Sequence, residues 1–342
     1  MHLCYMVREQ QFPNHLMINH SGSISLKTLL SLLSPTGKRG RLSIVIYHRV
    51  LTESDLLLGN KVNSDTFDSH LGYLTRYFNI LPLSEAVQRL SSGTLPSRAA
   101  CVTFDDGYAD NVEIALPILQ KHGVPATFFI ATGFINGGIM WNDKVIELIR
   151  RAPGDTLDLG KIGLGNHAIS SISQRQQLLF PLIDKLKYLP FEERHRRVDQ
   201  LCELVPVALP DNLMMTSEQI RKLHQAGMEI GGHTINHPIL ARLDDNLAFS
   251  EIANGKEMLE SIIGEPVHLF AYPNGKPGQD YLLQHPAMIK KIGFKAAVST
   301  AWGAARRSTD IYQLPRFTPW DSTHFRFALR MARNLLTTVE TI

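Results

Sequence analysis

The sequence predicts an α/β fold, a (β/α) barrel that carries one inserted, mostly helical segment. From Leu42 onward, short apolar runs alternate with helical patterns, as in βα units around a parallel sheet or barrel. The chain has 342 residues, 44% of them hydrophobic, which is enough to bury one large core. The sequence shows no internal repeat, so we expect one large domain with an insertion.

The predicted strands, in chain order, are LSIVIYH, AACVTFD, PATFFIA, MEIGGH, HLFAY and FKAAVST. Helical patterns begin at about Phe67 and Asn111, between these strands. Residues 1–23 are polar and lack periodicity, which predicts a loosely ordered extension before a domain of residues 24–342.

An insertion is predicted at about residues 144–215. There the run TLDLGKIGL alternates like an exposed strand pair, and two polar helical patterns follow it. The second pattern contains EERHRRVD, residues 192–199, whose basic side chains could bind an anionic polymer. A solvated helix face is the simpler interpretation of this run.

Charge and cysteine content exclude several functional classes. The 35 Lys and Arg residues against 32 Asp and Glu residues give a net charge of +3, so we expect no nucleic-acid partner. Three widely spaced cysteines encode neither a disulfide framework nor a CxxC metal site. No apolar run of signal-peptide or transmembrane length is found, so we expect a cytoplasmic protein. The leucine-rich stretch 26–33 leaves a place on a membrane surface open, although a helix packed on the domain is simpler.

Two adjacent carboxylates end the second predicted barrel strand. Asp105 and Asp106 directly follow the apolar run 99–104 and precede Gly107. The carboxyl ends of barrel strands face the active-site loops, and neighbouring side chains on a strand point in different directions. The two aspartates can therefore have different functions. The alternative is that the DDG turn only reverses the chain, as most such turns do.

Two histidines, His233 and His237, follow a later strand in EIGGHTINH. A helix or turn at this point would bring both imidazoles to one side. With Asp106 they make the composition of a catalytic Zn²⁺ site, and Co²⁺, Ni²⁺ or Fe²⁺ would suit the same ligands. Without the carboxylate, surface histidines at a helix end would be the simpler interpretation.

TFDDG followed by H-T-x-x-H resembles the first two motifs of the polysaccharide deacetylase family, also called the NodB-homology or carbohydrate esterase 4 family. FAYPNG, residues 270–275, lies where that family shows a strand followed by R-x-P-Y-G. The resemblance covers roughly residues 42–320. It implies a distorted barrel of the NodB type and an N-acetylated carbohydrate substrate. Within the family, the chain resembles the branch that deacetylates poly-N-acetylglucosamine exopolysaccharide.

The resemblance also implies roles for the motif residues. Asp105 is expected to be the general base, and Asp106, His233 and His237 are expected to hold one divalent ion and its attacking water. A backbone N–H near Asn274 is expected to help hold the oxyanion.

Four residues are expected to line the sugar site. Tyr272, Pro273 and Asn274 belong to the FAYPNG segment, and Trp141 offers an aromatic face for a pyranose ring. For Trp141, packing in the core is an equally good interpretation.

The sequence departs from the family pattern in two places. Ala271 replaces the arginine of R-x-P-Y-G, and no terminal L-x-H segment supplies the usual acid. We expect Arg316 in QLPRF to orient the base, with a surface salt bridge as the alternative. We expect His48 to be the general acid because a histidine pKa can lie near the working pH, with a strand-capping role as the alternative. His268 and His324 are the next candidates for the acid.

Two other functions stay open. A deformylase or another C–N hydrolase could act on a lipid-linked amino sugar or a small amide with the same scaffold. An inactive carbohydrate-binding domain would have lost the base or a ligand, whereas this chain keeps all of them. The motifs do not encode the sugar, its linkage and length, or the oligomeric state.

Overall fold

The computed structural model describes residues 26–59, 62–319, 321, 323–339 and 341–342. The predicted extension, residues 1–23, lies outside the described residues.

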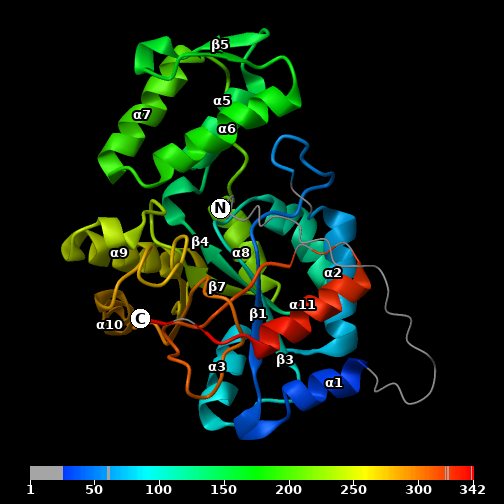
Figure 1. The fold of residues 1–342 in the computed structure, drawn as a ribbon. Helices are drawn as coiled ribbons and strands as arrows, with labels where there is room; N and C mark the ends of the chain where they lie inside the picture. Colours follow the sequence, from blue (N-terminus) through cyan, green and yellow to red (C-terminus); the bar gives the residue numbers. More distant parts are fainter. Residues whose placement is uncertain (1–25, 60–61, 320, 322, 340) are drawn as a thin grey trace.

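A curled, mostly parallel sheet forms the centre of the fold and confirms the predicted α/β barrel class (Figure 1). Its strands follow the order β1-β3-β4-β7-β8-β9, and the short β2 pairs with the start of β3. The strands are β1 (Leu42–Tyr47), β2 (Asn79–Ile80), β3 (Ala99–Phe104), β4 (Ala126–Ile130), β7 (Glu229–Gly232), β8 (Leu269–Ala271) and β9 (Ala296–Val298). β1 and β3 are buried at every position, which explains their unbroken apolar sequences.

A short segment after β9 bridges the two edges of this sheet. Leu314 pairs with Val298 of β9, and Phe317 pairs with Val45 of β1, both in parallel. The segment lies between the first and last strands and carries Arg316. It gives the barrel its distorted closure.

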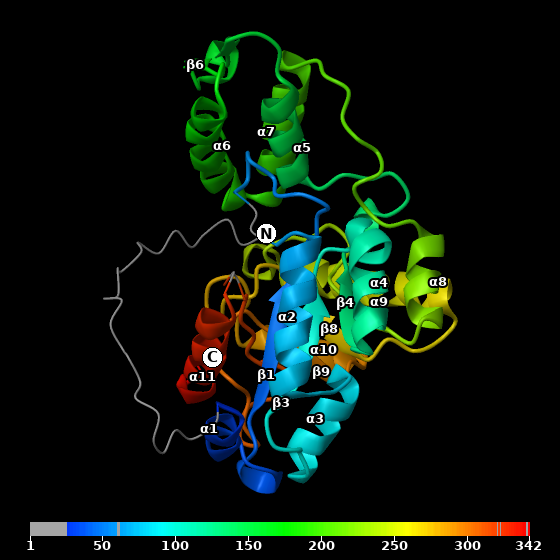
Figure 2. The same cartoon turned by 90° about the vertical axis from the view of Figure 1, so that its right-hand side faces the viewer.

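Helices cover the outside of the sheet, and α2 and α4 pack side by side on one face (Figure 2). They are α1 (Leu26–Leu33), α2 (Ser64–Tyr77), α3 (Leu83–Ser92), α4 (Leu116–His122), α8 (Ser217–Gln225), α9 (Asp245–Ile263), α10 (Gln284–Ile292) and α11 (His324–Leu336). α1 packs against α2 and α11 and buries Leu30, which is the simpler of the two arrangements considered for this stretch. None of the described helices is long and apolar enough to cross a membrane.

A separate lobe lies beyond the carboxyl ends of the strands (Figures 1 and 2). It contains α5 (Trp141–Arg151), the antiparallel pair β5 (Thr156–Asp158) and β6 (Asn166–Ala168), α6 (Ile172–Lys187) and α7 (Phe191–Leu204). Its apolar side chains, together with Leu57 of the segment after β1, form a cluster distinct from the other clusters of the chain. These elements occupy the region predicted as an insertion, whose status as an added unit stays a prediction.

Candidate active site

The three predicted metal ligands meet at the carboxyl ends of β3 and β7. Oδ1 of Asp106 lies 3.4 Å from Nε2 of His233 and 3.4 Å from Nε2 of His237. The three ligand atoms all lie within 4.8 Å of one another. Two atoms bound to one tetrahedral ion at about 2.1 Å lie about 3.4 Å apart, so this spacing fits a single ion.

The environment of Asp106 also fits a cation. Both of its carboxylate oxygens are buried and accept no hydrogen bond from the described residues. A buried carboxylate without a partner is costly, and a cation is the partner that removes this cost. Asp106 also has a φ of 78°, a conformation that costs about 1–3 kcal/mol in a residue other than glycine. The donor set and its burial therefore fit a divalent ion such as Zn²⁺.

A backbone carbonyl orients the first histidine. Nδ1 of His233 lies 2.7 Å from the carbonyl oxygen of Ala271. Nδ1–H donates to that oxygen, which leaves the lone pair of Nε2 available on the side of Asp106. The position that lacks the family arginine thus still supports the site through its backbone.

The turn between the two histidines is held by a glutamate of α9. Glu251 accepts hydrogen bonds from the backbone N–H groups of Ile235 at 3.0 Å and Asn236 at 2.8 Å. The Thr234 hydroxyl accepts the N–H of His237 at 3.1 Å. Thr234 and His237 have φ values of 65° and 50°, so a strained turn, not a helix, brings the imidazoles together.

The predicted contact between Arg316 and Asp105 is present. Nη1 and Nη2 of Arg316 each donate to one carboxylate oxygen of Asp105 at 2.7 Å. Nε donates to the Ser299 carbonyl at 3.0 Å, and Nη1 also donates to the Thr103 hydroxyl at 3.2 Å. Burial raises the pKa of Asp105, but Arg316 and His233 lower it more, so the net shift is downward. Asp105 is therefore ionised at neutral pH.

His48 lies beside the two aspartates, at the end of β1. Its carbonyl accepts a hydrogen bond from Asn111 Nδ2 at 2.8 Å. Burial lowers the pKa of His48 to about 4, although Asp106 and Asp105 raise it. The location suits a general acid, but the pKa differs from the expected value near the working pH because burial outweighs both carboxylates. The ring is neutral at neutral pH.

The two alternative acids lie elsewhere. His268 precedes β8, at the end of that strand opposite the site, and its Nε2 lies 3.2 Å from Nζ of Lys295. His324 begins α11, where its ring stacks on Tyr77 with centroids 5.2 Å apart. The structure brings neither imidazole to the ligands.

Tyr272 lies in the hydrophobic core of the barrel. Its side chain is 1% exposed and stacks on Tyr281 with ring centroids 3.9 Å apart. Its hydroxyl donates to the carbonyl of Tyr312 at 3.0 Å. Its contact with a sugar stays a prediction.

Pro273 and Asn274 form the loop after β8. Asn274 has a φ of 61°, and its carbonyl accepts the Thr300 hydroxyl at 2.7 Å. Arg316 Nε donates to the carbonyl of Ser299, the residue before Thr300. Two adjacent residues therefore hold this loop and the arginine that contacts Asp105. The sugar-contact and oxyanion roles of the loop stay predictions.

Trp141 begins α5 and is 9% exposed, with the guanidinium of Arg194 over its ring at 5.0 Å. Most of its surface packs inside the lobe cluster, so the core-packing interpretation accounts for most of the side chain. Trp141 is the first residue of the lobe, next to the barrel, and its role in binding a sugar stays a prediction.

Two polar residues that bind the segment after β1, residues 48–50, were not among the predicted site residues. Asp110 accepts from Arg49 Nε at 2.7 Å and from the Val50 N–H at 3.1 Å, and Asn111 binds the His48 carbonyl. Both residues follow TFDDGYA directly, so adjacency to the motif was the available signal. Nothing in the sequence marked Glu251, because its partners are distant along the chain.

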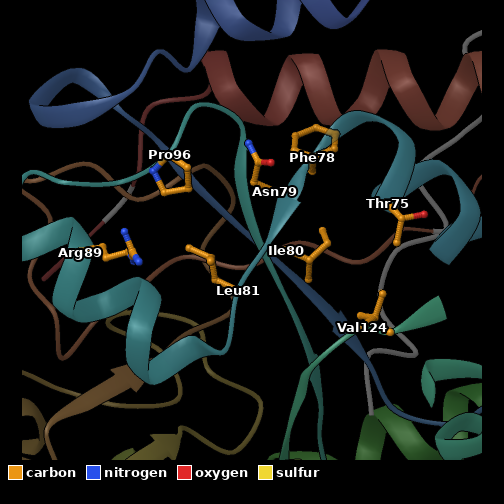
Figure 3. A pocket seen from close by; sticks show the side chains of 9 residues that line it. Thr75, Phe78, Asn79, Ile80, Leu81, Arg89, Pro96 and Val124 are labelled. Atoms are coloured by element: carbon orange, nitrogen blue, oxygen red, sulfur yellow. The ribbon is translucent and has the colours of Figure 1, made fainter. Parts of the chain in front are cut away.

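A hollow of about 490 Å³ lies away from this site (Figure 3). Its lining includes Asn79, which pairs with Ala99 at the start of β3, whereas Asp105 follows the end of that strand. It is lined by Thr75, Phe78, Asn79, Ile80, Leu81, Arg89, Pro96, Gly123 and Val124. Among the described residues that line it, Arg89 is the only charged one, and none is a carboxylate or a histidine.

The fold and the site together define a class of hydrolase. A sequence profile described as polysaccharide deacetylase matches residues 92–178 and 194–297, more than half of the chain. The chain belongs to the polysaccharide deacetylase family and is a hydrolase of that class.

Individual relatives agree with this family. The chain is 24% identical over 283 residues to "Putative polysaccharide deacetylase YxkH" of Bacillus subtilis (strain 168), which covers 82% of this chain and 72% of the relative. It is 35% identical over 75 residues to the poly-beta-1,6-N-acetyl-D-glucosamine N-deacetylase of Staphylococcus aureus (strain MSSA476), covering 22% of this chain and 26% of that protein.

Two solved structures share the fold. The deacetylase PplD of Streptococcus pyogenes, in complex with acetate, matches with a TM-score of 0.57 at 20% identity over 85% of this chain and 98% of that chain. IcaB from Ammonifex degensii matches with a TM-score of 0.56 at 19% identity over 87% of this chain and 98% of that chain.

Proposed function

We propose that this protein removes N-acetyl groups from a saccharide that contains N-acetylhexosamine, with one divalent ion held by Asp106, His233 and His237. The observation that carries the proposal is the pairing, in one buried site, of three ligand atoms within 4.8 Å with a separate carboxylate, Asp105, that Arg316 holds ionised. The name of the Staphylococcus aureus relative supports the same substrate class.

The bound ion would supply Lewis acidity, which acidifies water and polarises the acetyl carbonyl. Asp105 accepts the proton of the attacking water. Both of its oxygens are bound by Arg316, but each carboxylate oxygen has a second lone pair that can take a proton. A backbone N–H in the loop after β8, near Asn274, donates to the oxygen of the reacting acetyl group.

His48 delivers a proton to the departing amine, which would otherwise leave as a strongly basic anion. Because its ring is neutral at neutral pH before reaction, it must gain that proton within the catalytic cycle, and the proton that Asp105 takes from the attacking water is the available source. The two aspartates beside it favour its charged form, so they assist this step.

An assay of acyl release separates this proposal from its alternatives. Metal-loaded protein is incubated with N-acetylglucosamine oligomers, lipid-linked N-acetyl sugars, their N-formyl analogues and a small cyclic amide, with Asp105→Asn as the control. We expect acetate from the oligomers or the lipid-linked sugars, at a rate that Asp105→Asn lowers strongly. Faster release of formate, or turnover of the cyclic amide alone, would favour the second hydrolase function. Binding without release of either acid would indicate an inactive domain.

Zn²⁺ is the ion we propose, because an aspartate with two histidines suits it. Co²⁺, Ni²⁺ and Fe²⁺ bind similar ligands, so metal analysis of the purified protein and reconstitution with each ion decide between them.

A further inference from the structure

A buried cation without a carboxylate partner lies in the first half of α7. Arg194 is 3% exposed, and among the described residues no carboxylate forms an ion pair with it. Nη1 donates to the carbonyl of Lys187 at 3.3 Å, whereas Nε and Nη2 have no hydrogen-bond partner. Burial lowers the pKa of Arg194 to about 10, so the side chain is still charged at neutral pH.

Aromatic rings hold the guanidinium in place. Its carbon lies 5.0 Å from the ring centroid of Trp141 and 5.5 Å from that of Phe191. Such contacts with ring faces orient a guanidinium but leave its N–H groups unused. Nε and Nη2 share one edge of the guanidinium, and that edge matches the two oxygens of a carboxylate or phosphate.

Two hydrogen bonds connect the elements around Arg194 to the barrel. On the lobe side, Trp141 begins α5, and Asp143 in the same turn accepts the hydroxyl of Tyr108 at 3.0 Å. Tyr108 is two residues from the ligand Asp106.

The barrel side gives the second connection. Gln279, in the segment between β8 and α10, donates to the hydroxyl of Tyr188 at 2.7 Å. Tyr188 lies between α6 and α7, so the start of α7 is attached to the loop that follows Asn274. The elements that carry Arg194 are therefore attached to barrel segments that adjoin the site.

We propose that Arg194 binds an oxyanion, a carboxylate or a phosphate, on the saccharide next to the N-acetylated residue. This inference rests on the proposed function, and it names the substrate class as an anionic, N-acetylated saccharide. The exposed Arg196 and the half-buried Arg197 of the same run lie 3.8 Å from Glu193, so they belong to the solvated helix face while Arg194 turns inward.

The test compares matched tetrasaccharides on the metal-loaded full chain. One contains only N-acetylglucosamine, one alternates N-acetylglucosamine with glucuronic acid, and one carries a phosphate ester. We expect a higher kcat/KM per acetyl group for the carboxylate or the phosphate substrate, and the two arms show which oxyanion is preferred. Arg194→Met should lower that value roughly 10- to 100-fold, chiefly through KM, while the neutral substrate changes less than about 2-fold. Arg196→Met is the matched control and should change neither value.

Equal values for all three substrates in the wild type, or an equal loss on neutral and anionic substrates in Arg194→Met, would overturn the proposal. Arg194→Lys serves if the methionine variant does not fold, because it keeps the charge but loses the two-donor edge. If no substrate releases acetate, the deacetylase proposal fails while this one is still tested by fluorescence of Trp141. Glucuronate should then cause a saturable change in wild type and Arg196→Met but not in Arg194→Met, and an unchanged response in Arg194→Met would contradict it.

Discussion

The barrel site and the lobe each contain a buried ionic group whose polar atoms are not fully hydrogen-bonded by the described residues, and the two groups have opposite charge. In the barrel it is the carboxylate of Asp106, and in the lobe it is the guanidinium of Arg194. The other buried charge of the barrel site, Asp105, is fully paired with Arg316. On this basis we propose that the barrel provides a cation site for chemistry, whereas the lobe provides an anion site for recognition.

The two regions also differ in backbone strain. Asp106, Thr234, His237 and Asn274 all have positive φ values and all lie in loops at the carboxyl end of the sheet. Between residues 141 and 209, all of which the structure describes, positive φ occurs only at glycines. Strained residues cost about 1–3 kcal/mol each and persist where packing enforces them. We therefore expect changes in the lobe to leave the geometry of the barrel site intact.

The largest effect is expected from loss of the cation site. His237→Ala removes one of three ligands, so the variant should lose its bound ion and about 10³-fold or more in kcat/KM, since a metal contributes several kcal/mol to the transition state. Metal analysis and acetate release on the same sample check this. His122→Ala, a histidine that pairs with Asp68 on the surface, is the control and should keep both. Full activity in His237→Ala would remove this histidine from the site.

The next largest effect should come from the base. Asp105→Asn keeps the size of the side chain but cannot take a proton, so it should lose roughly 10² to 10⁴ in kcat while retaining the ion. Acetate release and metal content, measured together, separate this outcome from loss of the site. A wild-type rate in the variant would assign the base to another group.

Replacing His48 should produce a loss that depends on the leaving group. His48→Ala should lower amide hydrolysis by roughly 10²-fold and retain the ion. An activated aryl ester should be affected much less, because its leaving group needs no proton. Equal losses on amide and ester substrates would show that His48 is not the acid.

A smaller effect, visible in the pH profile, should follow from Arg316→Ala. The pKa of Asp105 is lowered in the folded protein, so activity is present above that pKa and is lost as pH falls through it. Without the guanidinium, burial raises the pKa, and the acidic limb of kcat/KM should move to higher pH. Arg316→Lys should restore part of the shift. An unmoved acidic limb in Arg316→Ala would mean that Arg316 does not control Asp105.

The smallest effect on chemistry is expected from the lobe core. Leu179→Ala should destabilise the lobe by about 2–5 kcal/mol, because the side chain is fully buried in the lobe cluster. Hydrogen exchange should speed up in α5–α7 but not in β3, and acetate release from a neutral tetrasaccharide should change less than about 3-fold. Loss of protection in β3 to the same degree would show that the two regions unfold as one.

The sequence was sufficient to predict the fold class and the clustering of Asp106, His233 and His237, because strand ends carry their polar residues within short motifs. TFDDG and HTINH each place their ligands locally, and the parallel sheet brings the two segments together. Arg316 was identifiable because the family arginine had been lost at Ala271 and a charged residue stood near the last strand.

Other features depend on contacts that no short segment encodes. The Ala271 carbonyl orients His233 from the next strand, and Glu251 reaches the histidine turn from a helix. Tyr272 follows the family motif closely, yet packing against Tyr281 turns it into the core. The pKa of His48 was also beyond sequence reasoning, since it depends on how deeply the folded chain buries the ring.

The central claim is that Asp106, His233 and His237 hold one ion on which deacetylation depends. Metal-free protein is titrated with Zn²⁺, and bound metal per chain and acetate release from an N-acetylglucosamine oligomer are measured on each sample. The account predicts that activity rises in proportion to bound metal and reaches its maximum at one ion per chain. Acetate release at full rate from metal-free protein would contradict it.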